Sequence, residues 1–129
     1  MRFDIITLFP ELFAPFLTAG VTRRAFESGL VEVHLWNPRD YAEGNYRRVD
    51  DRPFGGGPGM VMLAEPLARC LEAIRVERID DAPVILFSPI GNQINHRQVE
   101  RWSASAGAVL LCGRYEGIDQ RFIDAYVTH

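Results

Sequence analysis

The stretch Val84-Ile85-Leu86-Phe87 is a continuous apolar run, and the turn-forming sequence Ser88-Pro89-Ile90-Gly91-Asn92 follows it directly. A second run of this kind, Ala108-Val109-Leu110-Leu111-Cys112, leads into Gly113-Arg114-Tyr115-Glu116-Gly117. Apolar runs without alternation are typical of strands that are buried on both faces, as in parallel sheets. The two stretches therefore predict two buried parallel strands, each of which ends in a short loop that contains glycine.

The rest of the chain alternates predicted strands with predicted helices. Strands are expected over residues 3–9 and, with one exposed face, over residues 31–36. The predicted helices cover residues 10–17, 22–26, 65–74, 96–105 and 118–127. The segment from Pro38 to about Met62 has no period and is predicted to be a long functional or disordered loop. This order favours an α/β fold, a parallel sheet with helices on both faces.

Length and composition place limits on the class of protein. A chain of 129 residues forms one domain, and 47% hydrophobic with 24% charged residues excludes a disordered or collagen-like chain. The sequence has neither the run of about 20 apolar residues that a membrane helix needs nor a signal peptide, so we expect a cytoplasmic protein without a membrane partner. Cys70 and Cys112 lie far apart and indicate buried thiols rather than a disulfide or zinc site.

The basic residues suggest local rather than general binding of nucleic acid. All 14 are arginine, yet the formal net charge is −3. Within the long loop, Arg47, Arg48 and Arg52 alternate with aromatic residues, a pattern that suits stacking and phosphate pairing with single-stranded RNA. The aromatic residues of this pattern are Tyr41, Tyr46 and Phe54. A solvated loop with salt bridges is the alternative, because Asp and Glu residues nearby balance the arginines.

The loops that follow the two buried strands are candidates for a ligand site. If the strands are neighbours, both loops open into one crevice, and their glycines let the backbone approach a ligand closely. Ordinary strand-to-helix turns are the alternative. The glycine cluster from Gly55 to Gly59 is not a phosphate-binding loop, because Met60-Val61 replaces the required Lys-Ser/Thr.

No side chain is singled out as a catalytic residue. Ser88 lacks the G-x-S-x-G context, and Cys112 has no assignable base. His34 and His96 have no evident orienting partner in the sequence. Glu116 would meet a cation in its loop, or it would simply favour the following helix N-terminus.

Five blocks of sequence, in order, resemble the bacterial tRNA (guanine-N1)-methyltransferases, a family of SPOUT-type enzymes with a trefoil knot. These blocks are Ile6 to Phe13, Gly20 to Ala25, Asp50 to Met60, Ser88 to Gly91 and Cys112 to Asp119. The resemblance spans the whole chain and is far more specific than any single motif.

The resemblance implies transfer of a methyl group from S-adenosylmethionine to N1 of the guanine immediately 3′ of the anticodon, position 37. It also implies a homodimer that binds the tRNA anticodon loop. The implied cofactor contacts are Phe87, Ser88, Pro89, Gly91, Gly113, Arg114, Tyr115, Glu116 and Gly117, and the implied RNA contacts are Asp50, Arg52 and Gly59. N1 of guanine carries a proton at neutral pH, so the reaction needs a positioned base and an extruded nucleotide. Mg²⁺ would be held by Glu116 or by the cofactor carboxylate.

Two departures limit what the resemblance implies. Ile90 replaces the glutamine that the family usually has in Ser-Pro-Gln-Gly, so only backbone contacts carry over there. The presumed catalytic Asp and assisting Arg of the family lie beyond His129. We therefore expect a truncated amino-terminal domain over residues 1–129 that is inactive alone, with the knot incomplete. The alternatives are a non-catalytic cofactor-binding or dimerising module, and a folded core without a ligand site.

Overall fold

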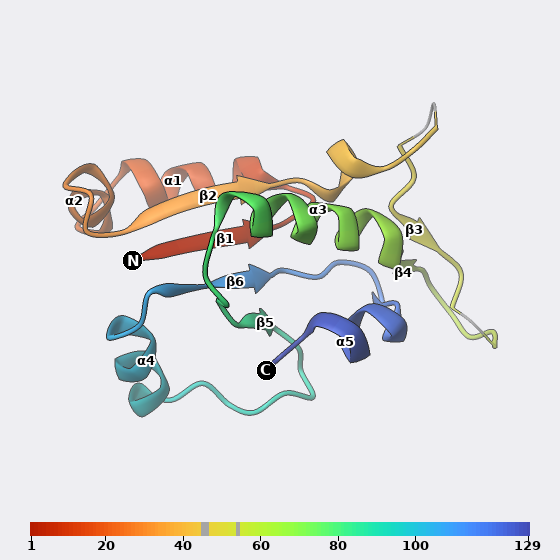
Figure 1. Cartoon of the computed structure of the whole chain (residues 1–129). Helices are drawn as coiled ribbons and strands as arrows, with labels where there is room; N and C mark the ends of the chain where they lie inside the picture. Colours follow the sequence, from red (N-terminus) through yellow and green to blue (C-terminus); the bar gives the residue numbers. More distant parts are fainter. Residues whose placement is uncertain (45–46, 54) are drawn as a thin grey trace.

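The computed structural model describes residues 1–44, 47–53 and 55–129. Its centre is a four-stranded sheet in the order β2-β1-β6-β5, with every neighbouring pair parallel (Figure 1). The strands are β1 (Arg2–Ile6), β2 (Glu32–Trp36), β5 (Val84–Leu86) and β6 (Gly107–Leu111). The predicted parallel sheet is confirmed, and the two apolar runs form the neighbouring strands β5 and β6.

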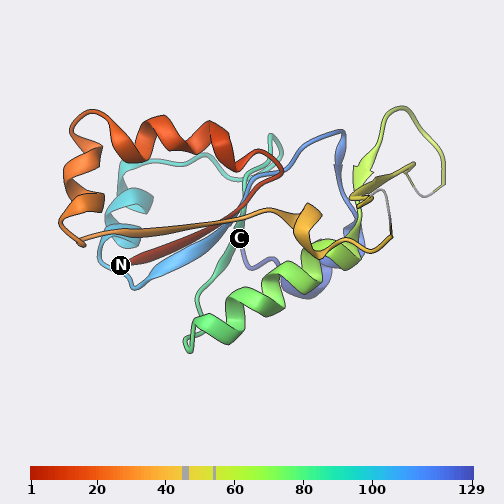
Figure 2. The ribbon, with the colours of Figure 1, turned by 90° about the horizontal axis from the view of Figure 1, so that it is seen from above.

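Helices cover both faces of this sheet, as predicted. They are α1 (Ala14–Thr18), α2 (Thr22–Glu27), α3 (Ala64–Glu77), α4 (His96–Ser103) and α5 (Gln120–Tyr126), with 3-10 turns at Pro10–Phe13 and Pro38–Tyr41. Figure 2 shows α1 and α3 on opposite sides of the strands. Asn95 caps the N-terminus of α4, since its Oδ1 accepts a hydrogen bond from the Gln98 N–H at 2.9 Å.

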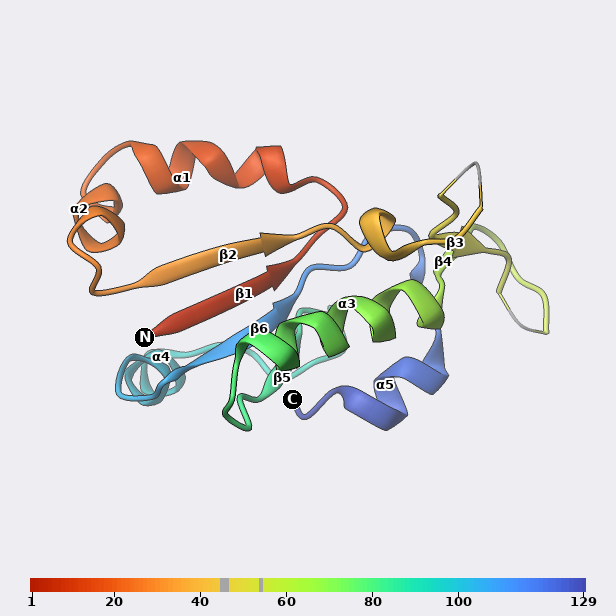
Figure 3. The ribbon, with the colours of Figure 1, turned by 45° about the horizontal axis from the view of Figure 1, so that its top comes forward.

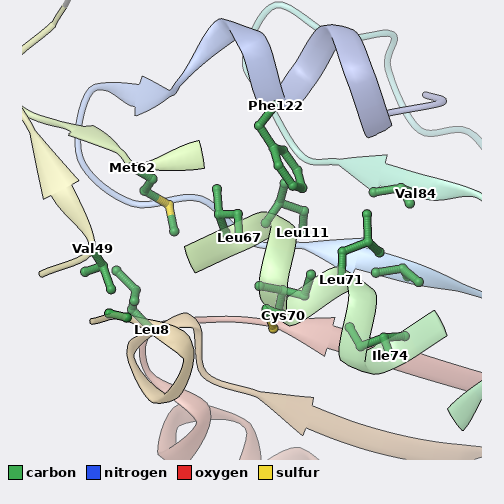
Figure 4. Packing of buried hydrophobic residues seen from close by; sticks show 13 residues of the cluster. Leu8, Val49, Met62, Leu67, Cys70, Leu71, Ile74, Val84, Leu111 and Phe122 are labelled. Atoms are coloured by element: carbon green, nitrogen blue, oxygen red, sulfur yellow. The ribbon is translucent and has the colours of Figure 1, made fainter. Parts of the chain in front are cut away.

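The main hydrophobic core lies between the sheet and the two helices α3 and α5. The helical spacing of Leu67, Leu71 and Ile74 places these residues on the buried face of α3, as the sequence predicted. Figure 4 shows them packing toward the sheet together with Cys70, Val84, Leu111 and Phe122. Burial of each large aliphatic side chain contributes about 1.5–3 kcal/mol, so this layer fixes α3 and α5 on the sheet.

A buried cluster of charged residues links the carboxyl end of α3, next to Arg78, to strand β1. Asp4 of β1 is fully buried, and the Arg78 side chain beside it is only 3% exposed. Asp4 accepts hydrogen bonds from Arg78 at 3.1 Å, Arg2 at 2.9 Å and the Trp36 indole at 2.8 Å. Burial acts to raise the pKa of Asp4, but these donors outweigh it and leave that pKa below its usual value.

The segment from Pro38 to Met62 contains more structure than the sequence predicted. Two short strands, β3 (Asp50–Asp51) and β4 (Val61–Met62), pair antiparallel, and β4 also pairs in parallel with β7 (Gly117–Ile118). Strands of two residues are too short to show a period, and β7 depends on a partner that is distant in the chain. The prediction of helix from residue 118 is also wrong, since that residue pairs in β7 and α5 begins at Gln120.

Two burial predictions need correction. In the predicted strand over residues 31–36, the alternation places Trp36 on the face expected to be exposed, but Trp36 is half-buried because its indole donates a hydrogen bond to Asp4 of the neighbouring strand β1. Cys70 is fully buried as expected, whereas Cys112 is half-buried because it begins the loop after β6. Among the described residues, no helix has the length and apolar character that crossing a membrane requires.

Candidate functional site

Two loops leave the carboxyl edge of the sheet side by side. β5 ends at Leu86 and β6 ends at Leu111, and these residues are paired in register. The Phe87 N–H donates to the Leu111 carbonyl at 3.3 Å, which extends the pairing by one residue. The first loop, Phe87 to Asn92, and the second loop, Gly113 to Gly117, therefore start next to each other, as the crevice prediction requires.

The first loop borders a pocket of about 630 Å³. Its turn is held by a hydrogen bond from the Gly91 N–H to the Ser88 carbonyl at 3.1 Å. A Cβ at Gly91 would lie 3.3 Å from that carbonyl oxygen, so a larger residue would crowd the turn. The predicted cofactor residues that line the pocket are Phe87, Ser88, Pro89 and Gly91, and the lining also includes Gln98, Trp102 and His129.

Ile90, the residue that departs from the family pattern, points away from this pocket. Its side chain is 96% exposed and is absent from the lining. Its N–H donates to Ser88 Oγ at 3.3 Å, which is a backbone contact that any residue type can make. The side chain at position 90 therefore forms no part of the lining of this pocket.

The second loop lies against the glycine loop, which we define as residues 55–60, rather than in the wall of the first pocket. The Glu116 N–H donates to the Met60 carbonyl at 2.8 Å, and the Arg114 N–H donates to Met62 Sδ at 3.4 Å. Tyr115 has a φ of 63°, which is rare for a residue with a side chain. The parallel pairing of β7 with β4 fixes this contact.

Gly59 and Glu116 bring the predicted RNA contacts next to the predicted cofactor contacts. A Cβ built on Gly59 would overlap the Glu116 side chain, and the Gly59 φ of 81° also favours glycine. Asp50 lies in β3, which pairs with β4 directly after the glycine loop. The structure therefore joins candidate residues that the sequence placed in two separate groups.

A second pocket, of about 660 Å³, lies at the small sheet and includes the predicted RNA contact Arg52. Val61, Leu63 and Ile118 give it an apolar part, and Asp51, Asp119 and Arg121 add charge. Arg121 bonds Asp119 at 2.6 Å and thereby lowers the pKa of that carboxyl. Arg121 was not among the predicted site residues, and its one signal in the sequence is its position two residues after the block that ends at Asp119.

The salt-bridge interpretation of the long loop is supported in part. Arg48 pairs with Asp51 at 2.6 Å, and its Nε donates to the Asp50 carbonyl at 2.9 Å. Two of the aromatic residues proposed to stack on RNA, Tyr46 and Phe54, lie outside the described residues. The third, Tyr41, packs near Trp36 with 6.5 Å between ring centroids.

The remaining candidates for nucleophile, base and metal ligand do not form a site within the described part of the chain. Burial raises the pKa of Cys112 and raises that of Cys70 to about 12, so both thiols stay protonated at neutral pH. His34 and His96 each do have a carboxylate neighbour, Glu32 at 3.4 Å and Glu100 at 3.3 Å, in exposed pairs. Among residues 1–44, 47–53 and 55–129, no group of three or more His, Cys, Asp or Glu could hold a metal ion.

A parallel sheet whose carboxyl edge carries adjacent glycine loops and a pocket defines an α/β ligand-binding domain. Comparison with known proteins makes this class specific. The family model described as "tRNA (Guanine-1)-methyltransferase TrmD" matches residues 1–129, and the chain belongs to this family. The SPOUT-type fold class that the sequence resemblance implied is thereby confirmed.

Individual relatives agree with this assignment. The tRNA (guanine-N(1)-)-methyltransferase of Albidiferax ferrireducens is 76% identical over 99% of this chain and 52% of its own length. That of a Polaromonas species is 72% identical over 98% of this chain and 51% of its own length. The crystal structure of tRNA (m1G37) methyltransferase from Aquifex aeolicus matches with a TM-score of 0.85 and 31% identity, over 99% of this chain and 57% of that chain. The chain spans about half the length of the curated relatives it matches.

Proposed function

We propose that this chain forms the S-adenosylmethionine-binding domain of a tRNA (guanine-N1)-methyltransferase. In this proposal, the complete enzyme transfers a methyl group to N1 of the guanine immediately 3′ of the anticodon. The observation that carries the proposal is that the first and second loops start side by side at the carboxyl edge of the sheet, and that the second loop contacts the glycine loop, in a chain of this family. The expectation of an incomplete knot stays a prediction.

The first pocket suits a cofactor of this size and chemistry. Its volume of about 630 Å³ lies within the range of small-molecule sites, about 300–1,000 Å³, and its lining mixes apolar residues such as Trp102 with polar ones such as Gln98. Phe87, Ser88, Pro89 and Gly91 would hold one end of the ligand, and the second loop, Gly113 to Gly117, would hold the other. When bound, S-adenosylmethionine supplies an electrophilic methyl group on a sulfonium centre.

In this proposal, the glycine loop and the residues next to it bind the RNA near the second loop, where the cofactor would lie. Asp50, Arg52 and Gly59 are our proposed RNA contacts, and the proximity of Gly59 to Glu116 would bring an extruded base close to the second loop. Arginine is suited to this work because its planar guanidinium pairs with phosphate and stacks on bases. The overall negative charge is consistent with binding that depends on local geometry.

The base that removes the N1 proton is not one of the residues we assign. We propose that this base lies in the part of the relatives' length that this chain does not cover, and that methyl transfer depends on that part. We also propose a homodimer, since large apolar side chains on and after α1, such as Phe16 at 67% and Val21 at 83%, are exposed. A cytoplasmic location follows from a tRNA substrate. Mg²⁺ binding through Glu116 or the cofactor carboxylate stays a prediction.

Equilibrium dialysis with labelled S-adenosylmethionine tests the proposal. We expect saturable binding to the wild-type chain. This binding should be lost in Gly91→Val but retained in Ile90→Ala, because Gly91 lines the pocket and Ile90 does not. Unchanged binding in Gly91→Val, or none to the wild type, would contradict a cofactor site at the first loop.

A methyl-transfer assay separates the enzyme from a non-catalytic module. The substrate is a tRNA with guanine just after its anticodon, and transfer is expected only when the chain is extended to the length of its relatives. Cofactor binding without transfer by the extended chain would favour the dimerising module instead.

A further inference from the structure

Phe9 is an apolar residue that the core does not use. It lies three residues after the end of β1, and it remains 40% exposed at the carboxyl edge of the sheet. The Cζ atom of Arg114 lies over its ring, 4.5 Å from the centroid. This distance is within the range of a cation–π contact, about 6 Å.

The backbone around Phe9 holds the ring in place. Its N–H donates to Thr7 Oγ1 at 3.1 Å, and its carbonyl accepts from the Leu12 N–H at 3.1 Å. Thr7 itself is buried and donates its N–H to the Trp36 carbonyl at 2.9 Å. These bonds fix the position of Phe9 just after β1, the strand that Figure 3 shows between β2 and β6 in the central sheet.

Apart from the contact between Phe9 and Arg114, a few backbone hydrogen bonds hold the second loop. The Cys112 N–H bonds the Ile6 carbonyl at 3.0 Å, and the N–H groups of Arg114 and Glu116 bond the segment before and within β4. Residues 113–116 are exposed, and Tyr115 has the rare φ of 63°. Among the described residues, Arg114 makes no ion pair, so the Phe9 ring is the contact that holds its side chain.

We propose that Phe9 is a positioning residue for Arg114 and, through it, for the second loop. The inference rests on the proposed function, in which this loop binds the cofactor. A guanidinium that stacks on a ring keeps its N–H donors free at its edge. Phe9 would thus hold Arg114 with these donors directed to the anionic carboxylate of the cofactor, and would limit the motion of Glu116.

Substitutions at position 9 distinguish the contribution of the aromatic ring to the Arg114 contact from that of an apolar side chain of similar size. Phe9→Leu keeps an apolar side chain without an aromatic face, and Phe9→Tyr restores the face. Tyr126→Leu is the matched control, because Tyr126 is also an exposed aromatic residue but lies on α5, outside the proposed sites. In the free protein we would measure hydrogen exchange at the Glu116 amide, and calorimetry would give the affinity for S-adenosylmethionine.

The expected loss is that of an exposed cation–π contact. Phe9→Leu should speed exchange at Glu116 and weaken cofactor binding, each by about two- to five-fold. Phe9→Tyr should restore both values, and Tyr126→Leu should change neither. Unchanged exchange in Phe9→Leu, or an equal loss in Phe9→Tyr, would overturn the proposal. A wild-type chain that binds no cofactor would defeat the proposed function, while exchange at Glu116 would still decide the role of Phe9.

Discussion

Gly59 and Glu116 come so close that position 59 has no room for a side chain. One belongs to the glycine loop and the other to the second loop after β6, so the contact joins two segments that are distant in the sequence. The hydrogen bond from the Glu116 N–H to the Met60 carbonyl, 2.8 Å long, reinforces it. A change in either loop is therefore transmitted to the other by direct contact.

Gly59→Ala should lower the free energy of unfolding by more than the strain of an alanine at this backbone φ explains, because the added Cβ would also overlap Glu116. The matched control is Gly29→Ala, because Gly29 has the same φ of 81° but nothing within 4 Å of a built Cβ. We expect the control to cost about 1 kcal/mol of unfolding free energy and Gly59→Ala to cost about 1–3 kcal/mol more. Urea denaturation of both variants measures the difference, and equal losses would contradict the proposed steric role.

Asp4→Asn should be among the most damaging single changes in the chain. It would remove the buried one of the two carboxylates that pair with Arg78, the other being Asp80, and loss of one partner of a buried pair costs about 3–5 kcal/mol. Trp36→Phe, which removes one neutral donor to Asp4, should cost about 1 kcal/mol. Glu77→Gln is the control, since Glu77 is an exposed partner of Arg2 and should cost less than about 1 kcal/mol. Chemical denaturation would rank the three, and the reverse order would contradict this account.

Acid should destabilise the fold through its paired aspartates. The pKa values of Asp4, Asp80 and Asp119 lie below their usual values, so the unfolded chain takes up protons before the folded one does. Stability should be nearly constant from pH 7 to about pH 5 and should fall as the pH drops below about 4. Urea midpoints measured across this pH range test the direction of the change. Asp80 is the exposed carboxylate that pairs with Arg78 at 2.9 Å, and Asp80→Asn is expected to make the loss of stability at low pH less steep. A stability that rises toward pH 3 would be inconsistent with these pairs.

Arg52→Gln should weaken RNA binding and reduce its salt dependence. Arg52 is exposed beside the pocket at the small sheet, and loss of one phosphate contact lowers the slope of log affinity against log salt by about 1. Arg97→Gln is the control, because Arg97 is equally an exposed arginine but lies on α4. Filter binding of an anticodon stem-loop at several salt concentrations gives both slopes. Equal effects of the two variants would indicate that only total charge matters.

The central sheet could be predicted because its signals are local. The runs at Val84 and Ala108 have the composition of buried parallel strands, and the structure pairs them as β5 and β6. The small sheet could not be predicted in this way, since a strand of two residues such as β4 has no period. Its existence depends on pairing between Val61 and Gly117, which are far apart in the chain.

The candidate site follows the same division. Sequence blocks identified Gly59 and Glu116 separately, but only tertiary packing shows that they touch. The buried cluster is similar, because Asp4 and Arg78 are 74 residues apart and neither residue type indicates burial by itself. Contacts of this kind are set by how the helices and strands pack together.

The pairing of β1 has a consequence for the order in which the protein forms during synthesis. β1 has two neighbours that are synthesised at very different times. β2, in which Glu32 pairs with Arg2, follows soon after β1 in the chain, but β6, in which Gly107 pairs with the same Arg2, comes near the end of the domain. A nascent chain therefore has one open edge on its first strand until most of the domain has left the ribosome. Closure of such a long loop is slow, and an open strand edge invites pairing with other chains. We expect this domain to depend on chaperones or low temperature for efficient production.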